Sequence, residues 1–110
     1  MTPNKKAKLI VNVLIDKKAQ DIVIMNLRKV TDMTYYFVIC TGESELHLRA
    51  LANELSEKIG TPWHIEGYTR GRWILLDYVN VVVHIFTKPL RDYYLLEQLW
   101  GDVPIKKVSP

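Results

Sequence analysis

The chain has 110 residues, of which 48% are hydrophobic and 25% are charged, with a net charge of +3. This length and balance are typical of one soluble globular domain. A membrane-spanning protein is excluded, because no apolar run approaches the ~20 residues needed to cross a bilayer. The residues after Lys8 also lack the small-residue cleavage site of a secretory signal. We expect one domain over residues 1–103 and a flexible tail over residues 104–110.

Cysteine and charge placement favour an intracellular protein with no strong affinity for nucleic acid. Cys40 is the only cysteine, which excludes an internal disulfide and is consistent with a reducing cytoplasm. The lysines lie mainly near the termini and the ends of expected elements, as on solvated faces. Only Arg70-Gly71-Arg72 combines basic charge with aromatic neighbours, Tyr68 and Trp73, and it leaves an RNA-binding module as one alternative. We expect a cytoplasmic protein without direct nucleic-acid binding.

The first half of the chain predicts the order helix, strand, strand, helix. Thr2-Pro3 is a suitable cap and first turn, and apolar residues follow at helical spacing as far as Leu14. Short apolar runs predict strands over residues 22–27 and 36–40. Ser44 then caps a second helix, whose apolar stripe is the clearest amphipathic pattern in the chain.

The second half predicts three strands and a last helix. A brief edge strand over residues 62–66 precedes a hairpin with strands over 73–78 and 81–86, and a helix begins at Pro89 and extends to Trp100. A hairpin is antiparallel, whereas strands joined through a helix can run parallel. The fold class is therefore α/β: a single domain with a mixed sheet of roughly five strands and about three helices.

The hairpin presents two different faces. Side chains alternate along a strand, so pairing Tyr78 with Val81 defines which residues share a face. The apolar face, which must meet a core, carries Ile74, Leu76, Tyr78, Val81, Val83 and Ile85. The mixed face carries Trp73, Leu75, Asp77, Val82, His84 and Phe86. Mixed aromatic and polar side chains are typical of protein-recognition surfaces. For an arbitrary α/β domain, a second covering layer that satisfies Asp77 and His84 is the slightly favoured alternative.

The last helix is apolar nearly all the way round. Its large apolar residues are Leu90, Tyr93, Tyr94, Leu95, Leu96, Leu99 and Trp100. A surface helix normally has one apolar stripe, so this helix is either enclosed by the core or offers part of its surface to a partner. A tryptophan near the end of a small domain is hard to bury completely, which favours the partner.

The sequence contains few motifs that indicate an enzyme. Gly42-Glu43-Ser44 lies between a strand and a helix and is the only segment that resembles a phosphate cradle. A nucleotidyltransferase also needs two carboxylates at alternate strand positions to hold Mg²⁺, whereas Asp77 is followed at that spacing by Val79. The histidines are isolated, and the pair His64 and Glu66 lacks a third ligand. We expect no enzyme activity, cofactor or metal, and a small nucleotidyltransferase or nucleotide-binding protein that uses Gly42-Glu43-Ser44 remains the alternative.

Several motifs together resemble the ribosomal silencing factor family, also called Iojap-like or RsfS. The resemblance extends from the first helix to Gly101. The motifs are Asp21-Ile22-Val23, Tyr36-Phe37-Val38-Ile39-Cys40-Thr41-Gly42-Glu43-Ser44, Glu66-Gly67-Tyr68, Trp73-Ile74-Leu75-Leu76-Asp77-Tyr78, Val81-Val82-Val83-His84-Ile85-Phe86, and Arg91 to Trp100.

This resemblance implies a nucleotidyltransferase-like fold without the catalytic carboxylates. It also implies a non-enzymatic protein that binds large-subunit ribosomal protein L-fourteen, blocks joining of the ribosomal subunits and represses translation under nutrient limitation. Two positions depart from the family pattern. Val79-Asn80 replaces Gly-Asp in the hairpin turn, and Tyr35 replaces an aspartate. Because valine resists the positive φ of a type I′ turn, a shifted register is an alternative that would reverse the two faces.

The resulting site hypothesis is a partner-binding surface. Trp73 and Leu75 form its apolar anchor, with the family's partner-binding strand at the same position. The further members are Asp77 and Glu97 as negative charges, Tyr93 and Tyr94 as an extension from the last helix, and His84 on the same face. Self-association of the free protein as a homodimer is an alternative use of this surface.

Overall fold

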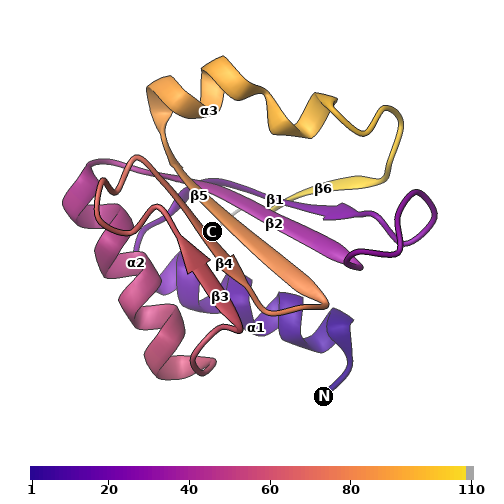
Figure 1. The fold of residues 1–110 in the computed structure, drawn as a ribbon, viewed down its shortest axis with the longest axis horizontal. Helices are drawn as coiled ribbons and strands as arrows, with labels where there is room; N and C mark the ends of the chain where they lie inside the picture. The colour runs from indigo at the N-terminus through magenta and orange to yellow at the C-terminus, as the bar shows by residue number, and fades with distance from the viewer. Residues whose placement is uncertain (109–110) are drawn as a thin grey trace.

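A six-stranded sheet with helices on both faces forms the molecule, and the computed structural model describes residues 1–108 (Figure 1). The strand order is β3-β4-β5-β2-β1-β6, in which β2 and β5 are parallel and the other neighbours are antiparallel. The helices are α1 (Pro3–Asp16), α2 (Glu45–Lys58) and α3 (Lys88–Tyr94). The strands are β1 (Gln20–Asn26), β2 (Tyr36–Gly42), β3 (His64–Glu66), β4 (Trp73–Asp77), β5 (Val81–Thr87) and β6 (Ile105–Val108). The predicted mixed α/β fold is confirmed.

Both predicted helix caps are present. The Oγ1 atom of Thr2 accepts a hydrogen bond from the Lys5 N–H at 3.2 Å, and the Oγ atom of Ser44 accepts one from the His47 N–H at 3.0 Å. Each bond satisfies an amide that has no partner within the first turn of its helix. The caps therefore explain why α1 and α2 begin where the sequence indicates.

The hairpin between β4 and β5 has the predicted register. The N–H of Tyr78 donates to the carbonyl of Val81 at 2.9 Å, so these two residues form the closing pair. Val79 adopts a φ of +73° despite its branched side chain. The carboxylate of Asp77 accepts from the Val79 N–H at 2.7 Å, and the carbonyl of Asn80 accepts from the amides of Tyr35 and Tyr36. These bonds hold the turn without the usual glycine.

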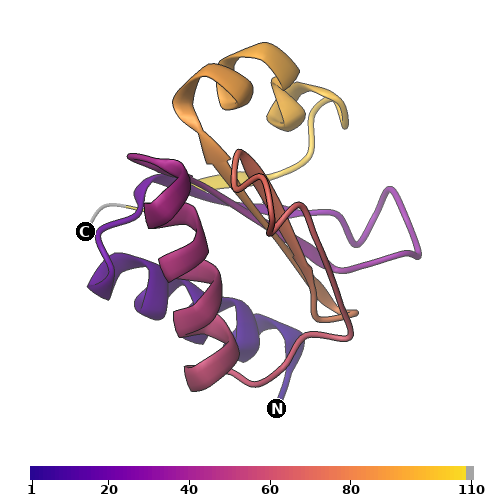
Figure 2. The same ribbon diagram turned by 60° about the vertical axis from the view of Figure 1, so that its left-hand side comes forward.

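Helices α1 and α2 cover one face of the sheet and α3 lies on the other (Figure 2). An apolar core lies on each of these faces. The inner core joins the apolar hairpin face to α1 and α2, and Ile74, Leu76, Val83 and Ile85 are completely buried in it. The outer core is smaller and joins β1, β2 and β5 to α3 and the segment after it. The face assignment made from the alternation is thus confirmed, and the outer face has a partial second layer.

The last helix is shorter than predicted. Helix α3 ends at Tyr94, because Leu95 adopts a left-handed conformation with φ of +47°. A single 3₁₀ turn, η1 (Leu96–Gln98), follows. The break changes the direction of the chain, and Leu96 becomes buried against the sheet. The prediction of one continuous helix to Trp100 is wrong.

The C-terminal segment also differs from its prediction. Residues 105–108, expected to belong to a flexible tail, form β6 and pair antiparallel with β1, with Ile22 opposite Val108 and Met25 opposite Ile105. The expected tail residues 109 and 110 lie outside the described residues. The added strand covers the edge of β1, which would otherwise present unpaired backbone groups. It also raises the strand count from the expected five to six.

Candidate functional site

A groove opens on the outer face of the sheet where α3 does not cover it. We call it the outer groove, and its volume is about 600 Å³. It lies over β4, β5 and the start of β2, and loop residues form its rim. The lining residues are Leu27, Thr31, Met33, Thr34, Phe37, Trp63, Leu75, Asp77, Val79, Val82, His84 and Trp100. Most of them are apolar, and two of them, Met33 and Trp63, are at least 78% exposed.

Trp73 lies beside the outer groove and is half-buried. Its ring packs against Phe86 and Tyr94, with ring centroids 4.8 Å and 4.9 Å away. Its indole N–H donates to the Nδ1 atom of His84 at 3.1 Å. The indole is therefore held in place by the sheet and by α3, and part of its surface remains accessible.

His84 connects Trp73 to the floor of the groove. The side chain is only 4% exposed, and burial lowers the pKa of its imidazole from 6.5 to about 4. The imidazole is therefore neutral at pH 7. Its Nε2 atom is buried and has no hydrogen-bond partner within the described residues. His84 is thus both a structural support for Trp73 and a buried polar group beneath the outer groove.

The structure brings together most of the site residues predicted from the sequence. Leu75, Asp77 and His84 line the outer groove. Tyr94 packs on Trp73, and Tyr93 is 76% exposed with its ring against that of Tyr94. Through these ring contacts, Tyr94 and Tyr93 extend the site from Trp73 to the outside of α3.

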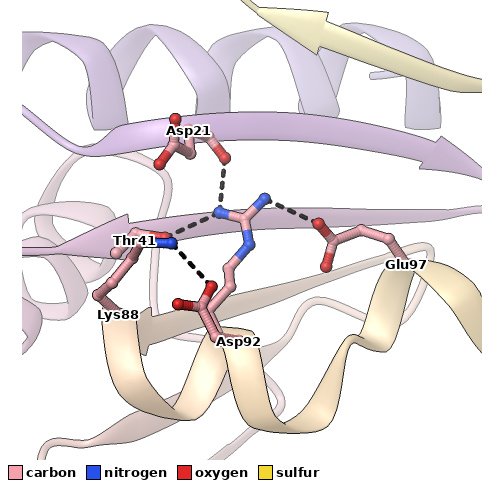
Figure 3. A network of polar contacts seen from close by, with 6 residues as sticks. Asp21, Thr41, Lys88, Asp92 and Glu97 are labelled. Atoms are coloured by element: carbon pink, nitrogen blue, oxygen red, sulfur yellow. Dashed lines mark hydrogen bonds and ion pairs between the residues drawn. The ribbon is translucent and has the colours of Figure 1, made fainter.

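Glu97 does not line the outer groove, and it pairs with a buried arginine (Figure 3). Arg91 donates to Glu97 at 3.1 Å, to the carbonyl of Asp21 at 2.6 Å and to the hydroxyl of Thr41 at 2.9 Å. The guanidinium thereby connects α3 to the adjacent strands β1 and β2. The charge of Glu97 serves this internal network, which leaves Asp77 as the acidic group at the groove.

Loops supply the site residues that the sequence pattern did not reveal. Thr31, Met33 and Thr34 precede β2, and Trp63 precedes β3. Loop residues follow no period of two or 3.6, so their faces cannot be assigned from spacing. The only available signal was the presence of large apolar residues, such as Met33 and Trp63, in segments expected to be exposed.

The segment Gly42-Glu43-Ser44 is not arranged as a phosphate cradle. The N–H of Glu43 donates to Nδ1 of His47 at 2.9 Å, and Ser44 caps α2. A side chain at Gly42 would lie 2.5 Å from Leu48, so this glycine permits close packing of the helix. These contacts account for the glycine and serine without a nucleotide.

The Cys40 thiol is a structural group in the core. Burial raises the pKa of the Cys40 thiol to about 12, which keeps it protonated and unreactive.

Across residues 1–108, no three histidine, cysteine, aspartate or glutamate side chains are grouped so that they could hold a metal ion. No helix in this range is long and apolar enough to span a bilayer.

Comparison with known proteins identifies the family. The model of the family described as "Ribosomal silencing factor during starvation" matches residues 1–110. The chain belongs to the ribosomal silencing factor family. The name of the family describes a regulatory role and not an enzymatic one, in agreement with the expectation from the sequence.

Individual relatives support this assignment over at least 80% of their length. The ribosomal silencing factor RsfS of Halalkalibacterium halodurans is 41% identical over 109 residues, covering 94% of this chain and 92% of that protein. The corresponding protein of Bacillus subtilis is 38% identical, covering 82% and 80%. A crystal structure of a Chromobacterium violaceum protein superposes with a TM-score of 0.87 at 32% identity, covering 100% of this chain and 95% of the other.

Proposed function

We propose that this ribosomal silencing factor binds the large ribosomal subunit through ribosomal protein L-fourteen and thereby prevents the small subunit from joining. Translation is repressed under nutrient limitation as a result. The action is steric, because the bound domain occupies space that the other subunit needs. It requires no cofactor, and its place of action is the cytoplasm, where ribosomes assemble.

The observation that carries this proposal is the open outer groove beside Trp73. A partly exposed aromatic anchor next to an apolar groove is typical of the central region of a protein interface. Asp77 at the groove adds one negative charge, which suits a basic ribosomal protein. Membership of the family supplies the ribosome as the target.

Leu75→Ala and Trp73→Ala test the assignment. Removal of a central anchor costs about 2–4 kcal/mol of binding, so both variants are expected to stay in the supernatant when large subunits are sedimented. Because Trp73 also packs inside the molecule, its variant is accompanied by an unfolding measurement. Leu46→Ala is the matched control, since Leu46 is 72% exposed on α2, on the inner side of the sheet.

A subunit-joining assay supplies the functional readout. The wild-type protein and Leu46→Ala are expected to reduce the formation of joined ribosomes, and Leu75→Ala is expected to lose this effect. Sedimentation of both groove variants at the wild-type level would show that the anchor is elsewhere. Failure of the wild-type protein itself to bind large subunits would reject the proposed function.

A further inference from the structure

The outer groove is apolar, yet three of the residues that line it each carry a buried polar atom without a partner within the described residues. These atoms are Nε2 of His84, Nε1 of Trp100 and Oγ1 of Thr34. His84 and Thr34 are only 4% and 5% exposed. Buried polar groups in native proteins are nearly always hydrogen-bonded, so three exceptions around one groove require an explanation.

The chemistry of two of these atoms is determined by their surroundings. The indole N–H of Trp73 is only a donor, so Nδ1 of His84 must be the acceptor of their bond. A neutral imidazole then carries its proton on Nε2. The indole nitrogen of Trp100 is likewise only a donor. His84 and Trp100, which both pack against Phe37, therefore present two N–H donors that need acceptors.

The charges around the groove restrict what can supply those acceptors. Among the lining residues in the described part of the chain there is no lysine or arginine, and Asp77 adds a negative charge. Arg28 and Lys29 lie outside the groove, in an adjacent pocket that shares Trp100. A phosphate or a carboxylate inside the groove would therefore lose its hydration with no cation among the lining residues to replace it. The neutral carbonyl oxygen of a peptide group satisfies an N–H donor at a much smaller desolvation cost.

We propose that the outer groove receives an extended peptide segment of the protein partner, which inserts an apolar side chain, displaces the side chains that cover the N–H groups of His84 and Trp100, and places backbone carbonyl oxygens on these two donors. A basic side chain of the same segment lies toward Asp77. The identity of the partner, a ribosomal protein, rests on the proposed function above. The hydrogen bonds from His84 and Trp100 to peptide carbonyl oxygens are a separate claim. They concern which chemical groups the groove can bind.

The pair Trp100→Phe and Trp63→Phe tests the claim. Both tryptophans line the groove, and each change removes one indole N–H while keeping an aromatic ring. Only Trp100 has its N–H buried without a partner, whereas Trp63 is 78% exposed. Affinity is measured by calorimetry with isolated ribosomal protein L-fourteen and by sedimentation with large subunits. Trp100→Phe is expected to weaken binding by about fivefold to tenfold, and Trp63→Phe by less than about twofold.

The stability of the free protein distinguishes recognition from a structural role. Loss of a donor that is unpaired in the free protein should leave the unfolding midpoint of Trp100→Phe unchanged or higher. Thr34→Val, which replaces the hydroxyl by a methyl group, is expected to behave in the same way. In the wild-type complex, the indole proton resonance of Trp100 should move downfield and exchange more slowly with solvent.

Two results would overturn the claim while leaving the proposed function intact. One is wild-type affinity of Trp100→Phe for the two probes. The other is weaker binding that is accompanied by a matching loss of stability in the free protein. Absence of wild-type binding to both probes would instead reject the proposed function, and the claim with it.

Discussion

At the residue scale, His84 is the group whose chemistry depends most on the fold. Its Nδ1 atom accepts from Trp73, its ring packs edge-on against Phe37 at 4.6 Å, and nearly all of its surface is buried. Protonation would place a positive charge in this apolar environment and would remove the acceptor of the Trp73 bond. The folded protein therefore resists protonation of His84.

This resistance predicts a loss of stability in mild acid. Between pH 6.5 and about 4, the unfolded chain binds a proton at His84 that the folded protein does not bind, so the free energy of unfolding falls as the pH falls. The full effect is on the order of 3 kcal/mol, and it levels off below about pH 4. Urea unfolding at several pH values measures it.

Two variants separate His84 from the other titrating groups. His84→Gln retains an acceptor for Trp73 but does not titrate, so its stability should depend less on pH over this range. His64→Gln is the control, because His64 lies on the exposed strand β3. Parallel pH profiles for the wild-type protein and His84→Gln would contradict the expected role of burial.

At the element scale, the strands and the first two helices can be predicted because their signals are local. The apolar alternation in β4 and β5 determines which face meets the core. Thr2 and Ser44 are residues that favour the N-cap position, and they occupy it in α1 and α2. The same alternation identifies Leu75, Asp77 and His84 as neighbours on the outer face. Even the turn at Val79 has the predicted register, because burial of a whole face outweighs the strain of one residue with positive φ.

The elements that could not be predicted depend on contacts between distant segments. The end of α3 lies at Leu95, a residue that favours neither a helix break nor a positive φ. Strand β6 is four residues long and forms because the edge of β1 is available for pairing. The ion pair between Glu97 and Arg91 likewise depends on the positions of β1 and β2, which hold the Arg91 side chain. The sequence alone therefore could not show that Glu97 belongs to this network and not to the groove.

Arg91 is the main polar link between α3 and the sheet. Arg91→Met removes three hydrogen bonds from a side chain that is 8% exposed and leaves Glu97 without its partner. We expect a loss of about 3 kcal/mol in the free energy of unfolding. Residues 88–100 should also become more sensitive to limited proteolysis, because this segment loses its link to β1 and β2.

Lys88→Met is the control for this prediction. Lys88 forms an exposed pair with Asp92 at 2.8 Å on the same helix, so its loss should change the stability by less than about 0.5 kcal/mol (Figure 3). Equal stability losses for the two variants would show that the buried network contributes no more than a surface pair.

At the scale of the whole molecule, most of the basic charge lies away from the outer groove, although Arg28 and Lys29 lie beside it, in an adjacent pocket that shares Trp100. Lys5 and Lys8 are exposed on α1, on the opposite side of the sheet, and Lys106 and Lys107 belong to the edge strand β6. The basic loop at Arg70 and Arg72 is closer to Trp73. In that loop, Arg72 pairs with Glu45 of α2 at 3.3 Å, which partly neutralises its charge. The net charge of +3 therefore does not describe the residues that line the outer groove.

Binding to large subunits should consequently depend only weakly on salt. An interface centred on the outer groove is expected to lose less than about threefold in affinity between 50 and 200 mM monovalent salt, at constant Mg²⁺. A protein that neutralises six phosphates would lose roughly a thousandfold over the same range. The double variant with Arg70→Ala and Arg72→Ala should bind as the wild-type protein does. A steep salt dependence that this double variant reduces would favour the RNA-binding alternative, in which Arg70, Arg72 and Tyr68 contact ribosomal RNA.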